Sequence, residues 1–303
     1  MKPKALILQA HGSNRDFDVM EALTLAGAEA CGIPLNELRK KKTLFSDYQM
    51  IVVPGGFSYG DALGAGKLLA LDLASYFAEE ISMFVDSGKP VIGICNGFQA
   101  LLKSGILPGH HVVARRVLRR DSAETPTKQS SHNRDASEKG EIASPRRHGD
   151  ASGYRPRNDI SATLTSNAQG HFECRWVTLA PVSQICLWTN NLEDAIECPI
   201  AHGEGNFQIS TSFPLSTFVE NDQIALTYVY PDGTPANGEY PFNPNGSLLD
   251  IAGICNPQGN VLGLMPHPEN HIQAYQHPQW TRGVQGHSGL KLFENGVKYA
   301  SGM

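Results

Sequence analysis

Residues 90–99 read Pro90-Val91-Ile92-Gly93-Ile94-Cys95-Asn96-Gly97-Phe98-Gln99. A short apolar run ends at a cysteine, and a glycine stands two residues away on each side of that cysteine. This pattern is typical of a buried strand that turns sharply into a helix and carries a nucleophile at the turn. Such a turn strains the backbone and leaves no room for side chains at the flanking positions, which explains Gly93 and Gly97. The free N–H groups and dipole of the helix N-terminus would favour a thiolate at Cys95 and stabilise an oxyanion.

Apolar runs alternate with helix-period stretches through the first hundred residues. Strands are predicted at 5–8, 50–53 and 91–94, with helices at 16–31 and 66–85 between them. Each apolar run is only four or five residues long, as expected of strands that are buried on both faces. Later runs at 176–179, 185–188, 224–229, 251–255 and 261–265 predict further strands of the same sheet, and 289–300 predicts a closing helix. The pattern indicates one α/β domain over 1–303 with a mostly parallel central sheet between two layers of helices.

The composition excludes several classes of protein. The chain has 303 residues, is 41% hydrophobic and carries a net charge of -5, which argues against a nucleic-acid-binding surface. No apolar run approaches the roughly 18 residues of a membrane span, and no leader segment is recognised at the N-terminus. The six cysteines form no CxxC pair and show no metal-ligand spacing with histidine. We therefore expect a cytoplasmic protein with free thiols, no bound metal and no membrane partner.

A polar insertion interrupts the pattern at about 116–170. Between residues 116 and 158 there are only four large apolar residues, with ten Lys and Arg against six Asp and Glu. Such a segment cannot offset its own ordering entropy, so we expect it to be disordered. It is either a basic arm for an acidic partner or RNA, or a solvated insertion. The absence of interleaved aromatic residues favours the solvated insertion.

A base and its partner are predicted after the strand at 261–265. His267 stands between Pro266 and Pro268, and Glu269 follows two residues later. Residues i and i+2 of an extended segment project to the same side, so Glu269 can bind one imidazole nitrogen while the other faces the thiol. Cys95, His267 and Glu269 would then form a catalytic triad.

A third segment has paired glycines at the end of a buried strand. Gly55 and Gly56 follow Val53 and Pro54, and strand ends at one edge of a parallel sheet are where ligands bind. Glycine lets the backbone approach a ligand closely and offers N–H donors to a developing oxyanion. A plain tight turn is the alternative for this segment.

Taken together, these segments resemble class I glutamine amidotransferases, and among them the glutaminase subunits of phosphoribosylformylglycinamidine synthase. The resemblance covers about 4–113 and 172–297 and rests on four segments in the same order as in that family: 54–61, 93–99, 202–207 (His-Gly-Glu-Gly-Asn-Phe) and 263–269. It implies a flavodoxin-like three-layer fold. The chain departs from the family at Arg15, where a cysteine that is not the nucleophile is common.

The resemblance also implies roles for individual residues. Cys95 would attack the side-chain amide of glutamine, and His267 with Glu269 would manage the protons as ammonia leaves and a glutamyl thioester forms. The backbone N–H groups of Gly56 and Asn96 would form the oxyanion hole. Glutamine would be bound by Gly55, Gln99, His202, Gly203 and Glu204.

The same resemblance implies partners. Ammonia would pass to a separate synthetase subunit that uses ATP and Mg to convert formylglycinamide ribonucleotide to formylglycinamidine ribonucleotide in purine biosynthesis, with a small accessory subunit between them. This chain has no P-loop, so we expect no cofactor in it. Two alternatives remain open: a stand-alone cysteine hydrolase or peptidase on the same scaffold, and a catalytically silent scaffold.

Overall fold

The computed structural model describes residues 2–40, 42–109, 162–210 and 214–303. The chain divides into two units, Met1–His111 with Asp159–Met303, and Val112–Asn158. The described helices and strands lie in the first unit. Most of the predicted insertion lies outside the described residues.

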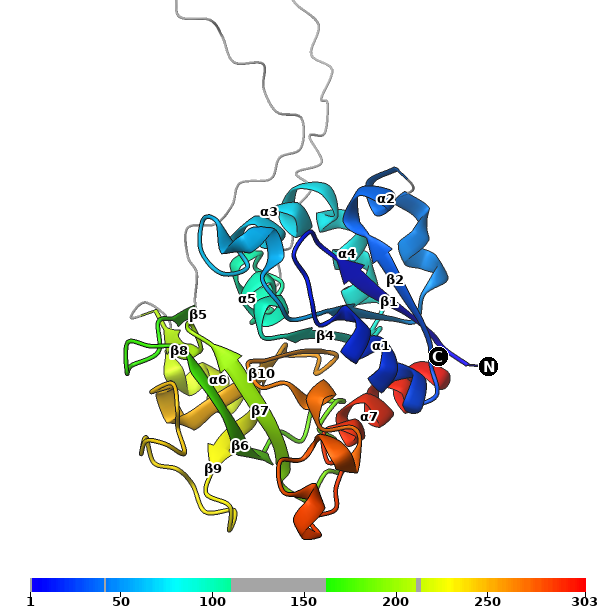
Figure 1. Cartoon of the computed structure of the whole chain (residues 1–303). Helices are drawn as coiled ribbons and strands as arrows, with labels where there is room; N and C mark the ends of the chain where they lie inside the picture. The colour runs from blue at the N-terminus through cyan, green and yellow to red at the C-terminus, as the bar shows by residue number, and fades with distance from the viewer. Residues whose placement is uncertain (1, 41, 110–161, 211–213) are drawn as a thin grey trace, which may run out of the picture. The chain divides into compact units, whose positions relative to one another are not determined.

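Nine of the described strands form one sheet (Figure 1). Its spatial order is β2 (Glu29–Pro34), β1 (Lys4–Gln9), β3 (Met50–Val53), β4 (Val91–Ile94), β11 (Val261–Leu264), β10 (Ile251–Cys255), β9 (Ile224–Val229), β6 (Glu173–Pro181) and β7 (Ile196–His202). The first five strands pair in parallel and the remaining pairings are antiparallel, so that only β10 and β6 run against the other seven. The prediction of a mostly parallel central sheet is confirmed.

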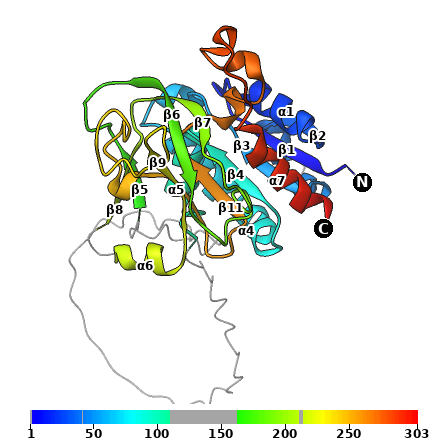
Figure 2. The same cartoon turned by 90° about the horizontal axis from the view of Figure 1, so that it is seen from below.

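Helices cover both faces of the parallel half of the sheet. On one face α1 (Asp16–Leu25) lies beside α7 (Leu290–Ser301), which brings the two chain ends close together (Figures 1 and 2). On the other face α3 (Lys67–Tyr76) packs against α5 (Asn96–Lys103). The strands between them are buried on both sides, and Ala5 to Leu8 of β1 are fully buried. This burial explains the unbroken apolar runs in the sequence.

The remaining elements are short. They are the helices α2 (Leu35–Lys40), α4 (Ala78–Asp86) and α6 (Leu215–Glu220), the 3₁₀ turns η1 (Lys42–Asp47), η2 (Ser58–Asp61), η3 (Leu248–Asp250), η4 (Pro268–Asn270), η5 (Ala274–Gln276) and η6 (Trp280–Arg282), and a two-stranded sheet of β5 (Ala162–Thr165) and β8 (Asn206–Ile209). None of the helices in the described ranges is long and apolar enough to cross a membrane.

The structure corrects the predicted insertion at its C-terminal end. Residues 162–170 fall within the predicted range of about 116–170, yet 162–165 form β5 and pair with β8. Ala162 and Leu164 of this strand are buried, so its period-two pattern provides the apolar contacts that the segment before it lacks.

The prediction of a strand at 185–188 was wrong. This segment forms turns, and its apolar character serves the fully buried Trp188. The indole Nε1 donates to Asn260 O at 3.2 Å. The ring lies against α7 at Gly296, where a Cβ would be 2.2 Å from the indole Cζ3. Trp188 therefore packs the 185–188 loop against α7, and no strand is needed to explain the apolar run.

Candidate active site

Cys95 occupies a strained turn between β4 and α5. Its φ is 50° and its ψ is -106°, a conformation that a non-glycine residue adopts only when its surroundings enforce it. The flanking glycines make the turn possible. A Cβ on Gly97 would lie 1.9 Å from Val53 O, and one on Gly93 would lie 2.5 Å from Leu101 Cδ1. The predicted demand for glycine at both positions is confirmed.

His267 and Glu269 are buried together where β11 ends. The backbone N–H of His267 donates to Pro199 O at 2.8 Å, which fixes the segment against β7. The imidazole Nδ1 lies 2.7 Å from Glu269 Oε1, so the carboxylate sets the tautomer and leaves Nε2 for the thiol. The predicted contact between His267 and Glu269 is therefore present.

The strands bring these groups to one edge of the sheet. Because β3, β4 and β11 are neighbouring parallel strands, the segments that follow them meet at their carboxyl ends. At Gly55, the position of a Cβ would be 2.9 Å from His267 Cε1 and 3.5 Å from Cys95 Cβ. Gly55 thus borders both the cysteine and the histidine. The side chain of Arg15 also reaches this point, with Cγ at 3.5 Å.

The electrostatics of the pair favour a thiolate and an imidazolium. Burial raises the pKa of Cys95, but the charge of His267 and, to a smaller extent, that of His202 outweigh this and lower the pKa to about 6. Burial lowers the pKa of His267, whereas Glu269 and the Cys95 thiolate raise it to about 10. Between these values the ionised pair is the dominant form, and a thiolate is the reactive form of cysteine.

The loop after β3 has an unusual backbone. Gly56 has a φ of 125°, and a Cβ there would lie 2.6 Å from Asn14 N. Tyr59, Gly60 and Asp61 follow with φ values of 56°, 61° and 50°. Three successive left-handed residues are costly, so this loop needs external contacts to hold its shape.

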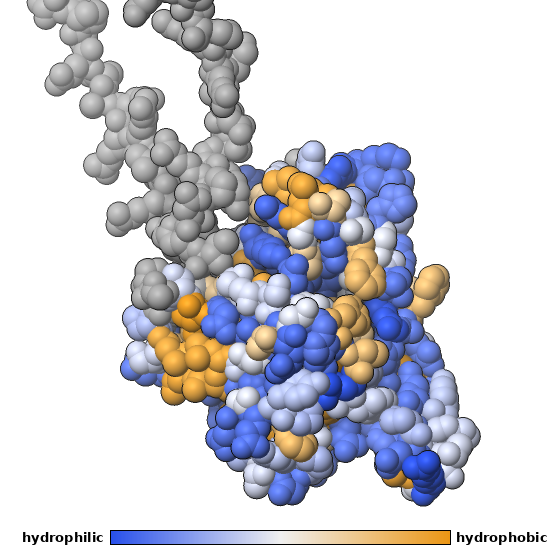
Figure 3. Space-filling model, turned by 60° about the vertical axis from the view of Figure 1, so that its left-hand side comes forward, coloured by the Kyte–Doolittle hydropathy of each residue, from blue (hydrophilic) through white to orange (hydrophobic). Residues whose placement is uncertain are grey.

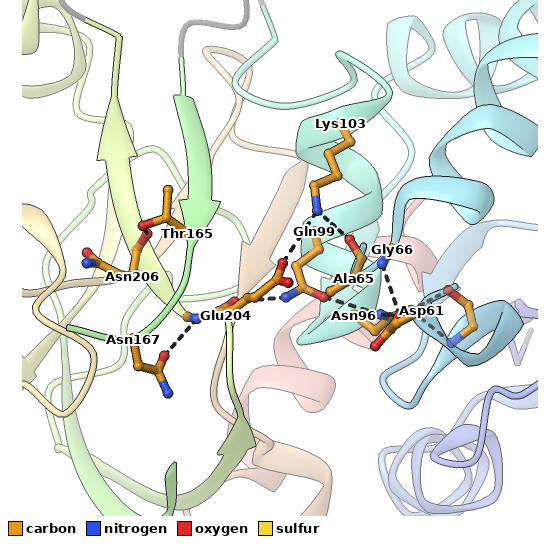
Figure 4. Close-up of polar contacts among 12 residues, drawn as sticks. Asp61, Ala65, Gly66, Asn96, Gln99, Lys103, Thr165, Asn167, Glu204 and Asn206 are labelled. Atoms are coloured by element: carbon orange, nitrogen blue, oxygen red, sulfur yellow. Dashed lines mark hydrogen bonds and ion pairs between the residues drawn. The ribbon is translucent and has the colours of Figure 1, made fainter. Parts of the chain in front are cut away.

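Asn96 supplies several of those contacts (Figure 4). Ser58 Oγ donates to Asn96 Oδ1 at 2.5 Å, and Asn96 Nδ2 donates to Asp61 Oδ1 at 3.0 Å and Gln99 Oε1 at 3.2 Å. The residue that follows the cysteine therefore ties the start of α5 to the strained loop. Sequence reasoning gave no role to Ser58, Asp61 or this side chain.

Gln99 extends the connection to the loop between β7 and β8. Its Nε2 donates to Glu204 O at 2.8 Å, and the Glu204 carboxylate lies 3.8 Å from Lys103 Nζ (Figure 4). Asn167 holds the same loop, since its Oδ1 accepts from Gly205 N at 2.9 Å and its N–H donates to Gly203 O at 2.9 Å. Both polar atoms of the Gln99 side chain thus have protein partners.

His202 lies at the end of β7 and is 4% exposed. Like His267, it lowers the pKa of the Cys95 thiol. Its Nε2 lies 3.0 Å from Asn245 Oδ1. Asn245 was missed by sequence reasoning, because within Pro244-Asn245-Gly246 an asparagine indicates a turn.

All six cysteines are free thiols. Cys186, Cys198 and Cys255 are buried, but Cys174, which lies beside the apolar run at 176–179 and is therefore expected in the core, is exposed. Within the described part of the chain, no group of three or more His, Cys, Asp or Glu residues could hold a metal ion.

The sequence profile of the CobB/CobQ-like glutamine amidotransferase domain matches residues 2–133 and 152–300. The chain belongs to this family of glutamine amidotransferases.

Individual relatives share nearly the full length of the chain. Phosphoribosylformylglycinamidine synthase subunit PurQ of Treponema denticola is 48% identical over 302 residues, which cover 99% of each chain. The PurQ subunit of Dehalococcoides mccartyi is 37% identical and covers 99% of this chain and 98% of its own. A chain in the structure of PurLQS from Thermotoga maritima is similar with a TM-score of 0.64 and 28% identity, covering 99% of both chains.

Proposed function

We propose that this chain is the glutaminase subunit of phosphoribosylformylglycinamidine synthase, which hydrolyses glutamine to glutamate and supplies ammonia to a synthetase subunit. The observation that carries the proposal is the buried group of Cys95, His267 and Glu269 in a chain that is 48% identical to a PurQ subunit over its whole length. The relatives reported above give no support to a stand-alone hydrolase or peptidase.

Cys95 is the nucleophile of the first half-reaction. The thiolate attacks the carboxamide carbon of glutamine, and the oxyanion that forms is bound by the backbone N–H groups of Gly56 and Asn96. The His267 imidazolium donates its proton to the departing amine, so that the carbon–nitrogen bond breaks and ammonia leaves. The products of this step are ammonia, a glutamyl thioester on Cys95 and a neutral imidazole.

Water completes the second half-reaction. His267 takes a proton from water as the water oxygen attacks the thioester carbon, and the carbon–sulfur bond then breaks to release glutamate. The sulfur leaves as a thiolate, which restores the ion pair. Glu269 stabilises the imidazolium at each stage through its contact with Nδ1.

Glutamine binds beside the nucleophile between two loops. Gly55 provides room next to Cys95 and His267, and the His202-Gly203-Glu204 segment forms the other wall. We assign Gln99 an indirect part, since its side chain holds the backbone of Glu204.

The partners follow from the relatives. PurLQS of Thermotoga maritima contains a chain like this one, and we infer a synthetase subunit and a small accessory subunit here as well. The synthetase would use ATP and Mg, while this chain contributes no cofactor, and the complex would work in the cytoplasm.

Phe57 and Leu63 beside the strained loop are exposed and are candidates for the contact surface. More generally, hydrophobic side chains form separate patches on an otherwise hydrophilic face (Figure 3).

The test is glutamate release from glutamine by wild type and Cys95→Ala, with and without the synthetase and accessory subunits, ATP and formylglycinamide ribonucleotide. We expect release that depends on Cys95 and increases in the full mixture. Equal release by both proteins in the full mixture would refute the proposal.

A further inference from the structure

Tyr59 belongs to the strained loop after β3, and its side chain connects that loop to α3. It has a φ of 56°, which a bulky residue adopts only when its surroundings enforce it. Its backbone N–H donates to His11 O at 2.5 Å, and its hydroxyl donates to Asp72 Oδ2. The backbone and the side chain of this one residue therefore attach the loop to two different parts of the molecule.

The Asp72 carboxylate is buried on α3 and has a second partner. Arg39 of α2 pairs with its other oxygen, and the guanidinium carbon lies 3.7 Å from the centre of the Tyr76 ring. Burial and the hydrogen bond to Asp72 raise the pKa of Tyr59 to about 12, so the hydroxyl keeps the proton that it donates. Because each oxygen of the carboxylate has its own partner, the contact with Tyr59 has a fixed orientation.

Packing does not hold the Tyr59 ring by itself. An open hollow of about 420 Å³ lies beside the ring, where His11, Gly12, Gly60 and Leu68 form the rest of its lining. The position of a Cβ at Gly60 has no atom within 4 Å. Since the ring has little contact on this side, its hydroxyl hydrogen bond determines where it lies.

Helix α3 is a fixed reference for the position of the nucleophile. It packs against α5, the helix that begins directly after Cys95. The two helices are close where α3 starts, since a Cβ on Gly66 would lie 2.9 Å from Ala100 N and 3.0 Å from Asn96 O. A hydrogen bond from the loop to α3 therefore fixes the loop relative to the helix that has Cys95 at its N-terminus.

The same loop carries the N–H group that we assign to the oxyanion hole. Gly56 pairs with Ser13 in an isolated antiparallel bridge, and the flanking Phe57 N–H donates to Gly12 O at 3.2 Å. In such a pair the flanking residues make the hydrogen bonds, so the N–H of Gly56 is not used by the bridge. The direction of this N–H depends on the backbone of the loop, which Tyr59 ties to α3.

We propose that Tyr59 and Asp72 are positioning residues, which hold the loop after β3 so that the Gly56 N–H points to the oxyanion formed at Cys95. They act through the backbone between Gly56 and Tyr59. A hydrogen-bond donor stabilises a developing charge best when its direction is fixed before the reaction, and the Tyr59–Asp72 contact provides this. The inference rests on the proposed function, because it concerns the same reaction.

The kinetic constants for glutamine test the proposal, measured with both partner subunits, ATP and formylglycinamide ribonucleotide. Tyr59→Phe removes only the hydroxyl. We expect kcat to fall about tenfold, which is less than the loss of a whole oxyanion donor, and KM to stay within about twofold of wild type. A donor that acts only in the transition state changes kcat and not KM, whereas a purely structural contact changes neither in the folded protein.

Substitutions of Asp72 check that the two residues act through one hydrogen bond. Asp72→Leu should lower kcat as much as Tyr59→Phe, and the double variant should again lose about tenfold instead of a hundredfold. Asp72→Asn keeps an oxygen that can accept from Tyr59, so its kcat should stay within about threefold of wild type. Additive losses, or a kcat in Asp72→Asn as low as in Asp72→Leu, would overturn the proposal. If Asp72→Leu does not fold, Tyr59→Phe and Asp72→Asn decide alone.

Tyr230→Phe is the matched control, because Tyr230 also donates to a carboxylate, that of Glu239, at an exposed contact. We expect the kcat of this variant to equal that of wild type. An unchanged kcat in Tyr59→Phe would overturn the proposal, and so would a loss that excess synthetase restores, since that loss would come from weaker binding of the subunits. Failure of the proposed function is a different result, because wild type itself would then release no more glutamate than Cys95→Ala.

Discussion

Gly97 shows how one missing side chain positions the nucleophile. An added Cβ would overlap the backbone of Val53, with contacts of 1.9 Å to its O and 2.7 Å to its C. Neither β3 nor α5 can shift easily, since both are buried in the centre of the molecule. We expect Gly97→Ala to lower the free energy of unfolding by about 1–3 kcal/mol and to displace Cys95. Denaturant unfolding and Cys95 alkylation measure the two effects.

Gly286→Ala is the control for Gly97→Ala. A Cβ at Gly286 meets His271 at an ordinary 3.5 Å. We expect near-wild-type stability and reactivity from it. Full Cys95 reactivity in Gly97→Ala would contradict the account of the turn.

Glu269 determines the alkaline side of the pH profile. The pKa of Cys95 is about 6 and that of His267 about 10, so activity should rise as the pH passes 6 and fall as it approaches 10. Glu269→Gln removes the charge that raises the pKa of His267. Without that charge the pKa of His267 falls and the ionised pair is lost at lower pH, so the alkaline limb should move to lower pH and the rate should fall about a hundredfold or more.

The measurement for Glu269 is kcat/KM for glutamine against pH in the full complex. Glu239→Gln, which alters an exposed carboxylate bonded to Tyr230, serves as the control. An alkaline limb that stays near pH 10 in Glu269→Gln would show that the carboxylate does not support the pair.

At the scale of elements, Asn96 joins α5 to the loop that includes η2. Its amide binds Ser58 and Asp61, and the loop between them has left-handed backbone. In Asn96→Ala we expect a loss of about 1–3 kcal/mol in the free energy of unfolding, because buried polar partners become unsatisfied. We also expect slower glutaminase turnover, because the Gly56 N–H loses its support.

Asn295→Ala is a suitable comparison for Asn96→Ala. Its amide also donates two hydrogen bonds to a loop, to Trp188 O and Asn190 O, but it lies on α7. Denaturant unfolding and glutamate release distinguish the two variants. We expect both to have a lower free energy of unfolding, and only Asn96→Ala to release glutamate more slowly. Equal turnover would argue against a role of the loop in the oxyanion hole.

The elements differ in how well the sequence predicts them. Strands β3 and β4 and the central four residues of β1 are buried apolar runs, and their positions were predicted closely. The predicted helix at 16–31 instead ends at Leu25, and β2 follows at the sheet edge, where its residues are half-exposed and include Gly32 and Pro34. The predicted helix at 66–85 divides at the buried Phe77. Edge strands and helix breaks depend on tertiary contacts that periodicity does not reveal.

The residues of the candidate site also differ in how well the sequence predicts them. Cys95 and the His267–Glu269 contact follow from local patterns of spacing and glycine. Asn245 does not, because its contact with His202 arises only when β7 and a turn meet.

At the scale of the whole molecule, the sheet, its covering helices and all candidate site residues belong to Met1–His111 and Asp159–Met303. We predict that deletion of residues 119–155 leaves glutamate release intact. A shorter connection between α5 and β5 loses less closure entropy, so the free energy of unfolding should stay the same or rise by about 1 kcal/mol. Thermal unfolding and activity of the deletion variant check this, and loss of folded protein would contradict it.

The residues of the candidate active site lie on both sides of residues 110–161 in the sequence. Cys95 and the glycine loop precede residues 110–161, while His202, His267 and Glu269 follow them. If the polypeptide were cut in that interval, one fragment would hold a nucleophile without a base and the other a base without a nucleophile. Among the described strands, the fragments would join the large sheet only through β4 and β11, four residues in register. Recovered glutaminase activity would then report fragment complementation through this strand pair together with the packing of α1 on α7.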